Sequence, residues 1–133
     1  INHFPPILIY FRIRKEILVS TTNTNQQQTD RCIKDCAEVV RLASRCADEC
    51  LGGGQGDTMS QCVRLCLDCV DLATTCMELL GRNSQFAAQL CGVCAEACTV
   101  CAKECDTQQS GGIMHKCAEA CRSCSESCRQ MAA

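Results

Sequence analysis

The sequence predicts an all-α protein, an antiparallel up-down-up-down four-helix bundle with a cysteine-lined core. Three observations lead to this prediction. Seventeen of the 133 residues are cysteines. They recur mostly at steps of three and four residues, a spacing that places side chains on one face of a helix. They also fall into four groups separated by short polar or glycine-containing linkers, which favours antiparallel neighbouring helices.

The first predicted helix covers residues 27–51 and ends at a run of three glycines, Gly52 to Gly54. Its cysteines are spaced Cys-x3-Cys-x9-Cys-x3-Cys, and Val39 and Ala43 occupy the stripe where cysteine is missing. We therefore expect less metal at that level of the core. The thiols of this helix are Cys32, Cys36, Cys46 and Cys50.

The second predicted helix covers residues 58–80. Thr58-x-x-Gln61 has the form of a capping box at its start, and Gly81 follows its end. Ala73 interrupts the cysteine stripe, so the same reduction in metal is expected there. The thiols of this helix are Cys62, Cys66, Cys69 and Cys76.

The third predicted helix begins at Asn83 or Ser84 and continues to about residue 106, and the fourth follows Gly111-Gly112 and reaches about residue 130. At about 100° per residue, the five thiols of the third helix fall within a stripe of roughly 80°. The fourth helix has a stripe of similar width. These two helices carry Cys91, Cys94, Cys98, Cys101 and Cys105, then Cys117, Cys121, Cys124 and Cys128.

Residues 1–26 differ from the bundle at 27–131 and are treated as an N-terminal extension. They contain no cysteine and three of the four aromatic residues. Pro5-Pro6 disfavours a helix start before Ile7, and the apolar run at 7–11 is too short to span a bilayer. The sequence leaves two structures open: a short helix or strand packed outside the bundle or on a second subunit, and a disordered tail.

Charge and motifs exclude several functions. The net charge of −2 and the pI of about 5.6 disagree with the basic surface that nucleic-acid binding requires. The chain has no glycine-rich phosphate loop and no catalytic constellation, so we do not expect an enzyme. Neither a nucleic acid nor a membrane is an expected partner.

The cysteine pattern predicts a reduced, metal-binding core. Disulfide frameworks belong to short, loop-rich secreted chains with an even cysteine count, whereas here the count is odd and the cysteines lie within helices. Neighbouring thiols on one helix also do not point at each other as a disulfide requires.

Thiolates select Cu(I), Zn(II) or iron–sulfur clusters. A zinc site made of four thiolates carries a net charge of about −2, which is costly in a dry bundle. Cu(I) accepts two thiolates, and thiolates that each bridge two ions give a neutral filling of about one copper per sulfur. The sequence therefore predicts storage of many Cu(I) ions, with about one proton released per ion.

Three alternatives remain at this point. Thiolates could sequester zinc or several metals, as metallothioneins do. The spacing Cys91-x2-Cys94-x3-Cys98-x2-Cys101 resembles that of an iron–sulfur protein, but ferredoxin motifs lie on loops and often place proline after the last cysteine. A catalytic thiol is the third alternative.

One end of the predicted bundle adds weaker Cu(I) ligands. The C-termini of the first and third helices and the N-termini of the second and fourth meet there. We expect Met59, Met114 and His115 to bind or admit copper at this end, since thioether and imidazole hold Cu(I) less tightly than thiolate.

These cysteine ribbons resemble those of the bacterial copper storage proteins, a four-helix-bundle family once described as ferredoxin-like. The resemblance covers residues 27–131. It implies a core that stores many Cu(I) ions and assembly as a homo-oligomer, often a tetramer. We also expect a copper donor or acceptor protein as a partner. One branch of the family carries a twin-arginine export signal. Here the basic residues Arg12, Arg14 and Lys15 follow the apolar run, the opposite order from a secretory signal, so we expect the cytoplasmic branch.

Overall fold

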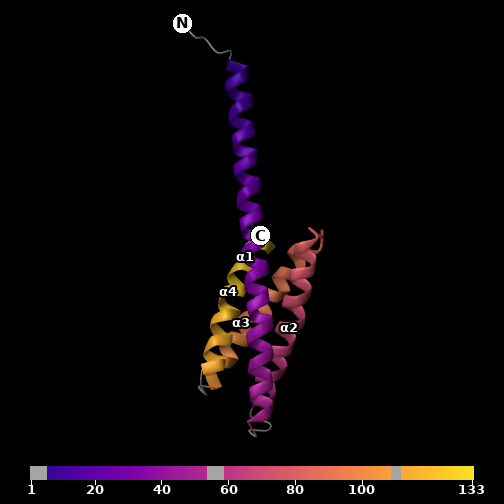
Figure 1. Ribbon diagram of the computed structural model, residues 1–133, viewed down its shortest axis with the longest axis vertical. Coiled ribbons are helices and arrows are strands. Elements are labelled where there is room, and N and C mark those ends of the chain that lie inside the picture. The colour runs from indigo at the N-terminus through magenta and orange to yellow at the C-terminus, as the bar shows by residue number, and fades with distance from the viewer. Residues whose placement is uncertain (1–5, 54–58, 109–111) are drawn as a thin grey trace.

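The computed structural model describes residues 6–53, 59–108 and 112–133, with the backbone alone at 18–23. These parts of the chain form four α-helices: α1 (Pro6–Gly52), α2 (Ser60–Gly81), α3 (Ala87–Gln108) and α4 (Gly112–Ala132). Because α1 has 47 residues and α2 has 22, the first half of α1 extends beyond the other three helices (Figure 1).

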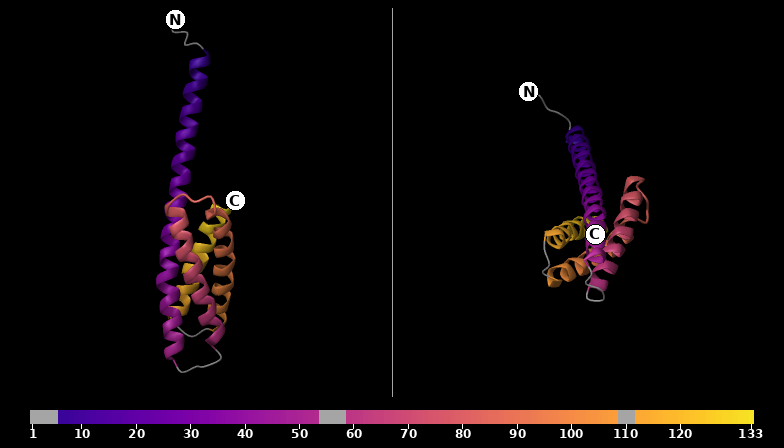
Figure 2. Two further views of the ribbon diagram at one scale, coloured as in Figure 1. Left: turned by 90° about the vertical axis from the view of Figure 1, so that its right-hand side faces the viewer. Right: turned by 60° about the horizontal axis from the view of Figure 1, so that its bottom comes forward.

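The four helices form an up-down-up-down bundle. Each packs along its two neighbours, in the order α1–α2, α2–α3, α3–α4 and α4–α1. Within the described residues the backbones of the diagonal pairs stay apart, and diagonal helices meet only through side chains in the interior. Figure 2 shows the helices running side by side around one shared interior. The predicted fold class is confirmed.

The interior is built from small side chains at helical spacing. Every third or fourth residue of α2 is buried, namely Cys62, Cys66, Cys69, Ala73 and Cys76. The same spacing on the other helices turns one face of each toward the centre. Val39, Ala43 and Ala73 are completely buried, as the interrupted stripes predicted.

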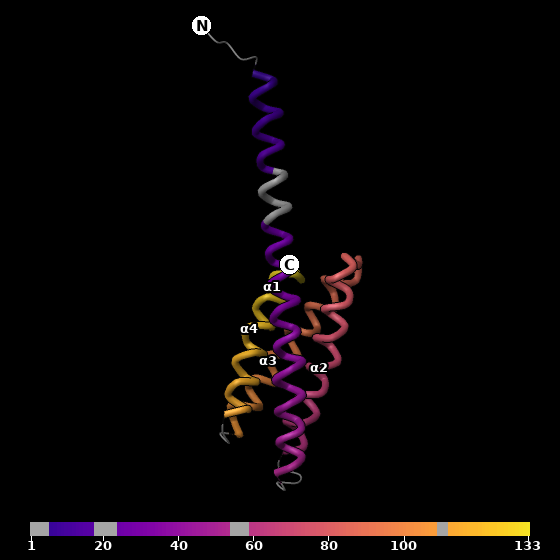
Figure 3. Tube along the Cα trace, in the orientation of Figure 1, coloured from indigo at the N-terminus to yellow at the C-terminus, as the bar shows by residue number. Residues whose placement is uncertain are grey.

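The start of α1 differs from the sequence prediction. The helix was expected to begin at residue 27, and it begins at Pro6. Proline is tolerated in the first turn of a helix because its missing N–H has no partner there in any case, and residues 7–26 contain neither proline nor glycine. Side chains one turn apart also bond along this part of the helix, as in Arg12 with Glu16 at 3.4 Å and Gln26 with Asp30 at 2.9 Å. Figure 3 traces the helix as a tube.

The turn between α2 and α3 explains a second difference. Asn83 has φ of 53° and ends α2, with its N–H bonded to the Leu80 carbonyl at 3.2 Å and the Ser84 N–H bonded to the Leu79 carbonyl at 2.9 Å. This is the pattern of a left-handed helix cap, which asparagine accepts more readily than most residues. As a result α3 begins at Ala87 and not at Asn83 or Ser84.

The remaining helix ends lie close to their predicted positions. Met59 is the N-cap of α2 and no side chain caps the helix there. Thr58, the first residue of the predicted capping box, lies outside the described residues. None of the described helices has a stretch that is long and apolar enough to cross a membrane.

Candidate metal centre

All seventeen cysteines are free and buried. Most have no exposed surface, and the most exposed, Cys50, retains 7%. A helical stripe on each of four facing helices therefore places every thiol of the chain in one interior. The only buried polar or charged side chains among the described residues are Ser125 and Ser127, so no lysine, arginine or histidine accompanies the thiols.

Thiols from different helices are in direct contact, and the pairing changes along the bundle. In one half α1 meets α4: the Sγ atoms of Cys32 and Cys128 are 3.6 Å apart, and those of Cys36 and Cys124 are 3.7 Å apart. In the other half α2 meets α3, with Cys62–Cys105 and Cys66–Cys101 both at 3.8 Å. The thiols thus form a column that runs along the bundle.

Groups of three or four thiols along this column have all their Sγ atoms within 4.8 Å of one another. Metal–thiolate bonds of about 2.3 Å, as in zinc sites, place two sulfurs on one ion no more than about 4.6 Å apart, so these groups can bind a metal with little movement. Five such groups are present: Cys36, Cys94, Cys124 and Cys128; Cys32, Cys91 and Cys128; Cys69, Cys98 and Cys121; Cys46, Cys62, Cys66 and Cys105; and Cys66, Cys101, Cys105 and Cys117.

The groups overlap. Cys128 belongs to both groups at one end of the column, and Cys66 and Cys105 belong to both groups at the other. A thiolate shared by two groups is positioned to bridge two metal ions. Cys50 and Cys76 are buried in the same core but belong to none of these groups.

The middle of the column holds fewer thiols. The group of Cys69, Cys98 and Cys121 receives no thiol from α1. At this level α1 presents Val39 and Ala43 to the core, both completely buried. The sequence predicted this reduction from the gap in the stripe.

Burial and thiol–thiol contact change the acidity of the cysteines in opposite directions. Burial, followed by the negative charge that Cys105 acquires on deprotonation, raises the pKa of Cys62 to about 12. Hydrogen bonds that stabilise the thiolate, from Cys101 first and then from Cys46 and Cys66, lower the pKa of Cys105 to about 4. A metal ion that binds between contacting thiols must displace the protons that these thiols hold.

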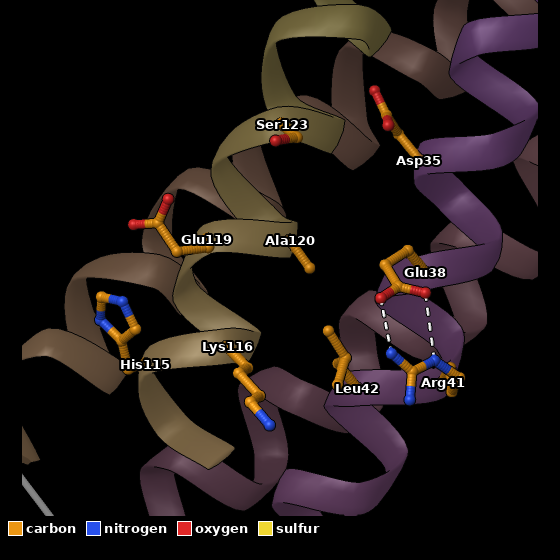
Figure 4. A pocket seen from close by; sticks show the side chains of 9 residues that line it. All are labelled: Asp35, Glu38, Arg41, Leu42, His115, Lys116, Glu119, Ala120 and Ser123. Carbon is orange, nitrogen blue, oxygen red and sulfur yellow. Dashed lines mark hydrogen bonds and ion pairs between the residues drawn. The ribbon is translucent and has the colours of Figure 1, made fainter. Parts of the chain in front are cut away.

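The three weaker ligands predicted at one end of the bundle lie in different surroundings. Met59 and Met114 are buried in the thiol-containing core, at the beginning of α2 and α4. His115 is exposed and lines a surface groove of about 490 Å³ between α1 and α4, beside Lys116 and Glu119 (Figure 4). No cysteine lines this groove, so His115 stands apart from the thiols.

The sequence analysis did not single out two serines that the structure buries in α4. One of them is Ser127, whose hydroxyl contacts Cys32. Together with the larger effects of Cys128, Cys36 and Cys91, this contact lowers the pKa of Cys32. Ser125 donates a hydrogen bond to the Ala95 carbonyl at 3.0 Å and contacts Thr99 at 2.7 Å, which joins α3 to α4. The only signal in the sequence was their place between two cysteines of one stripe.

The fold and the thiol column define a class: a helical bundle that holds metal ions on cysteine in its interior. The family model of the copper storage proteins matches residues 25–133. No curated protein matches the chain.

Solved structures agree with the family match. A protein of Nitrosospira multiformis is 36% identical, with 80% of this chain and 96% of that chain covered and a TM-score of 0.73. The Cu(I)-bound copper storage protein of Bacillus subtilis is 30% identical, with coverage of 80% and 99% and a TM-score of 0.75. A cytosolic copper storage protein of Streptomyces lividans, solved with five coppers, is 28% identical, with coverage of 83% and 96% and a TM-score of 0.79.

The chain belongs to the copper storage protein family. Its function is storage of copper in the cysteine-lined core of the bundle, and it is not an enzyme. The resemblance and the function inferred from the cysteine ribbons are confirmed. The zinc, iron–sulfur and catalytic alternatives give way to copper storage.

Proposed function

We propose that all seventeen thiolates act together as one Cu(I) store, with most of them bridging two ions. The observation that carries this proposal is that four of the five thiol groups overlap in pairs, two at Cys128 and two at Cys66 and Cys105. Overlapping groups let copper ions share sulfur atoms along the column and do not require isolated sites. The proposed ligands are the seventeen cysteines already named, from Cys32 to Cys128.

Charge favours Cu(I) as the stored ion. Because no basic side chain is buried with the thiols, a tetrathiolate zinc site would leave about two negative charges without a counter-ion in the interior. One Cu(I) per bridging thiolate leaves no negative charge without a counter-ion. Three structures of relatives support several Cu(I) ions per chain here: the Cu(I)-bound protein of Bacillus subtilis, and the Streptomyces lividans protein with five coppers and after loading with 10 copper equivalents.

Copper access is proposed at the end where α2 and α4 begin. Met59 and Met114 are buried there, beyond the last thiols of the column, and His115 is exposed just outside. Weak thioether and imidazole ligands would pass Cu(I) inward without retaining it, since thiolate binds this soft ion more tightly.

The setting of the protein is part of the proposal. A cytoplasmic location is supported by the Streptomyces lividans relative, which is described as cytosolic. We further propose that residues 27–131 are the storage bundle and residues 1–26 a separate extension. The chain assembles as a homo-oligomer, in the form of a tetramer. A protein donor or acceptor exchanges copper with it.

An anaerobic Cu(I) titration of the fully reduced chain tests the proposed store. The chain is titrated in the presence of a chromophoric Cu(I) chelator, so that only tightly bound ions are counted. We expect the chain to withhold on the order of ten or more Cu(I) ions from the chelator, because bridging gives about one ion per thiolate. Saturation at four or fewer ions would refute the proposal, as would an iron–sulfur absorption band in the purified protein.

A further inference from the structure

The first part of α1 stands apart from the bundle. From Pro6 the helix extends beyond the ends of α2, α3 and α4 before it joins them (Figures 1 and 2). Every side chain described between residues 6 and 17 is exposed. Large apolar side chains there expose at least half of their surface, from 50% at Ile9 and Ile13 to 62% at Ile7 and Tyr10. Copper storage in the core does not use this segment.

The apolar side chains cover most of the circumference of this segment. At about 100° per residue, Ile9, Ile13 and Ile17 lie within an arc of about 80°. Tyr10, Ile7 and Phe11 continue it to an arc of about 200°. Lys15, Arg12 and Glu16 occupy the opposite, narrower side together with a single apolar residue, Leu8. The segment is therefore an amphipathic helix with a wide apolar face and a narrow charged face.

The charged residues of the segment are mainly basic. The segment has three basic residues and one acidic residue, namely Arg12, Arg14, Lys15 and Glu16. Arg12 already pairs with Glu16 at 3.4 Å, and among the described residues no ion pair engages Arg14 or Lys15. Two positive charges per chain are therefore left unpaired, that of Arg14 within the apolar arc and that of Lys15 next to it, in a chain whose net charge is −2.

This arrangement disfavours a second copy as the occupant. Arg14 lies within the apolar arc, between Tyr10 and Ile7 around the helix, so two such segments that pack through the arc each bury an unneutralised guanidinium group. Burial of an unpaired charge is unfavourable. At a lipid surface, by contrast, a long basic side chain keeps its stem in the apolar layer and extends its charge to a phosphate.

We propose, against the expectation from the sequence that a membrane is no partner, that residues 6–17 bind the surface of an anionic lipid bilayer. The apolar arc lies in the boundary between headgroups and acyl chains, and Arg14 and Lys15 contact lipid phosphates. A wide apolar face with aromatic residues and a basic charged side is the pattern of helices that lie in a membrane interface. Binding at the surface does not require the length that a membrane span requires, which this helix lacks.

The direction of the extension is compatible with copper exchange. It leaves the bundle near Cys32 of α1 and the end of α4, whereas Met59 and Met114 lie at the beginning of α2 and α4, at the opposite end. A membrane that holds the extension therefore leaves the proposed access end uncovered. The chain becomes a copper store held at a membrane surface.

Co-sedimentation of the reduced full-length chain with vesicles tests this proposal. One set of vesicles is phosphatidylcholine alone, and the other is an equimolar mixture of phosphatidylcholine and phosphatidylglycerol. We expect binding to the mixed vesicles, and its loss when Ile9→Asp and Ile13→Asp are combined. Leu67→Asp with Val93→Asp is the matched control, because both residues are exposed on the bundle and not on the extension.

A second pair of variants tests the contribution of charge. Arg14→Gln with Lys15→Gln should weaken partitioning into the mixed vesicles by about 25-fold, since each basic residue near an anionic surface contributes roughly fivefold. Lys34→Gln with Lys103→Gln removes the same charge from the bundle and should change little. Circular dichroism and the Cu(I) titration check that every variant remains folded and binds copper.

Two results would overturn the proposal. One is no sedimentation with mixed vesicles, and the other is equal binding by the Ile9→Asp, Ile13→Asp variant. If either result comes with a smaller oligomer of that variant in sedimentation velocity, a second copy is the occupant of the apolar arc. None of these results bears on copper storage, which the titration tests separately.

Discussion

The Sγ atoms of Cys32 and Cys128 lie 3.6 Å apart, although 96 positions separate the two residues in the chain. This contact joins the beginning of the thiol stripe on α1 to its end on α4 and closes the bundle around the column. It also places Cys128 between two thiol groups, with Cys32 and Cys91 in one and with Cys36, Cys94 and Cys124 in the other.

Loss of Cys128 should cost more copper than loss of a cysteine outside the groups. Cys128→Ser removes a ligand from two groups and should lower the Cu(I) endpoint by about two ions, because each group loses a bridging sulfur. Cys50→Ser, outside all five groups, should lower it by about one ion or none. Both variants are compared in the anaerobic titration, and equal endpoints would contradict the shared role of Cys128.

A thiol added in the gap of the stripe should add storage capacity. Ala73→Cys places a new side chain four residues after Cys69 and three before Cys76, at a completely buried position. We expect about one more Cu(I) per chain, because a further thiolate can bridge ions already in the column. Ala88→Cys, exposed on α3, is the control and should add no ion that resists a competing chelator. An unchanged endpoint for Ala73→Cys would mean that this position does not reach the thiol column.

Ser125 should stabilise the metal-free bundle without affecting storage. Ser125→Ala removes hydrogen bonds to the Ala95 carbonyl and to Thr99 across the α3–α4 contact. We expect the free energy of unfolding to fall by about 1 kcal/mol, measured by urea denaturation, with the same Cu(I) endpoint. Ser44→Ala, at an exposed position of α1, should not destabilise the bundle. A changed Cu(I) endpoint in Ser125→Ala would assign this residue to the metal site.

The metal-free protein should lose stability at high pH. Burial raises the pKa of Cys62 from 9.0 to about 12, so the folded state holds this proton more tightly than the unfolded state. The resulting stabilisation is complete below pH 9.0 and is lost as the pH rises toward about 12. Anaerobic urea denaturation at several pH values measures the loss, and Cys62→Ala should reduce it. A free energy of unfolding that is constant above pH 9.0 would contradict the raised pKa.

Local sequence did not decide where helices begin. Residues 1–26 contain no cysteine and run into a polar stretch, so the sequence predicts the start of the helix at residue 27, where the composition changes. The helix starts at Pro6 because nothing between Pro6 and the bundle breaks it. At the other boundary, the left-handed conformation of Asn83 delays α3 to Ala87. A single sequence shows that asparagine can adopt this conformation but not that it does.

For the candidate site, the sequence predicted which cysteines share one face of each helix, but not which thiols of different helices contact each other. The spacing of Cys91, Cys94 and Cys98 on a helix fixes that all three share a face, and the gap at Val39 and Ala43 correctly marked the level with fewer thiols. The separation of His115 from Met114 follows from the same spacing. His115 follows Met114 by one residue, and one residue is about 100° around a helix, so the methionine is buried while the histidine lies in the outer groove.

The sequence by itself determined the periodicity: four stripes of sulfur, the helices that carry them, and therefore a thiol-lined interior with an affinity for a soft metal. Only the tertiary structure decided which thiols meet. The pairing of Cys32 with Cys128 and of Cys62 with Cys105 depends on how far one helix is shifted along its axis relative to its neighbour. This axial shift is set by caps, turns and the packing of small side chains across the whole bundle, and not by the spacing within any one helix.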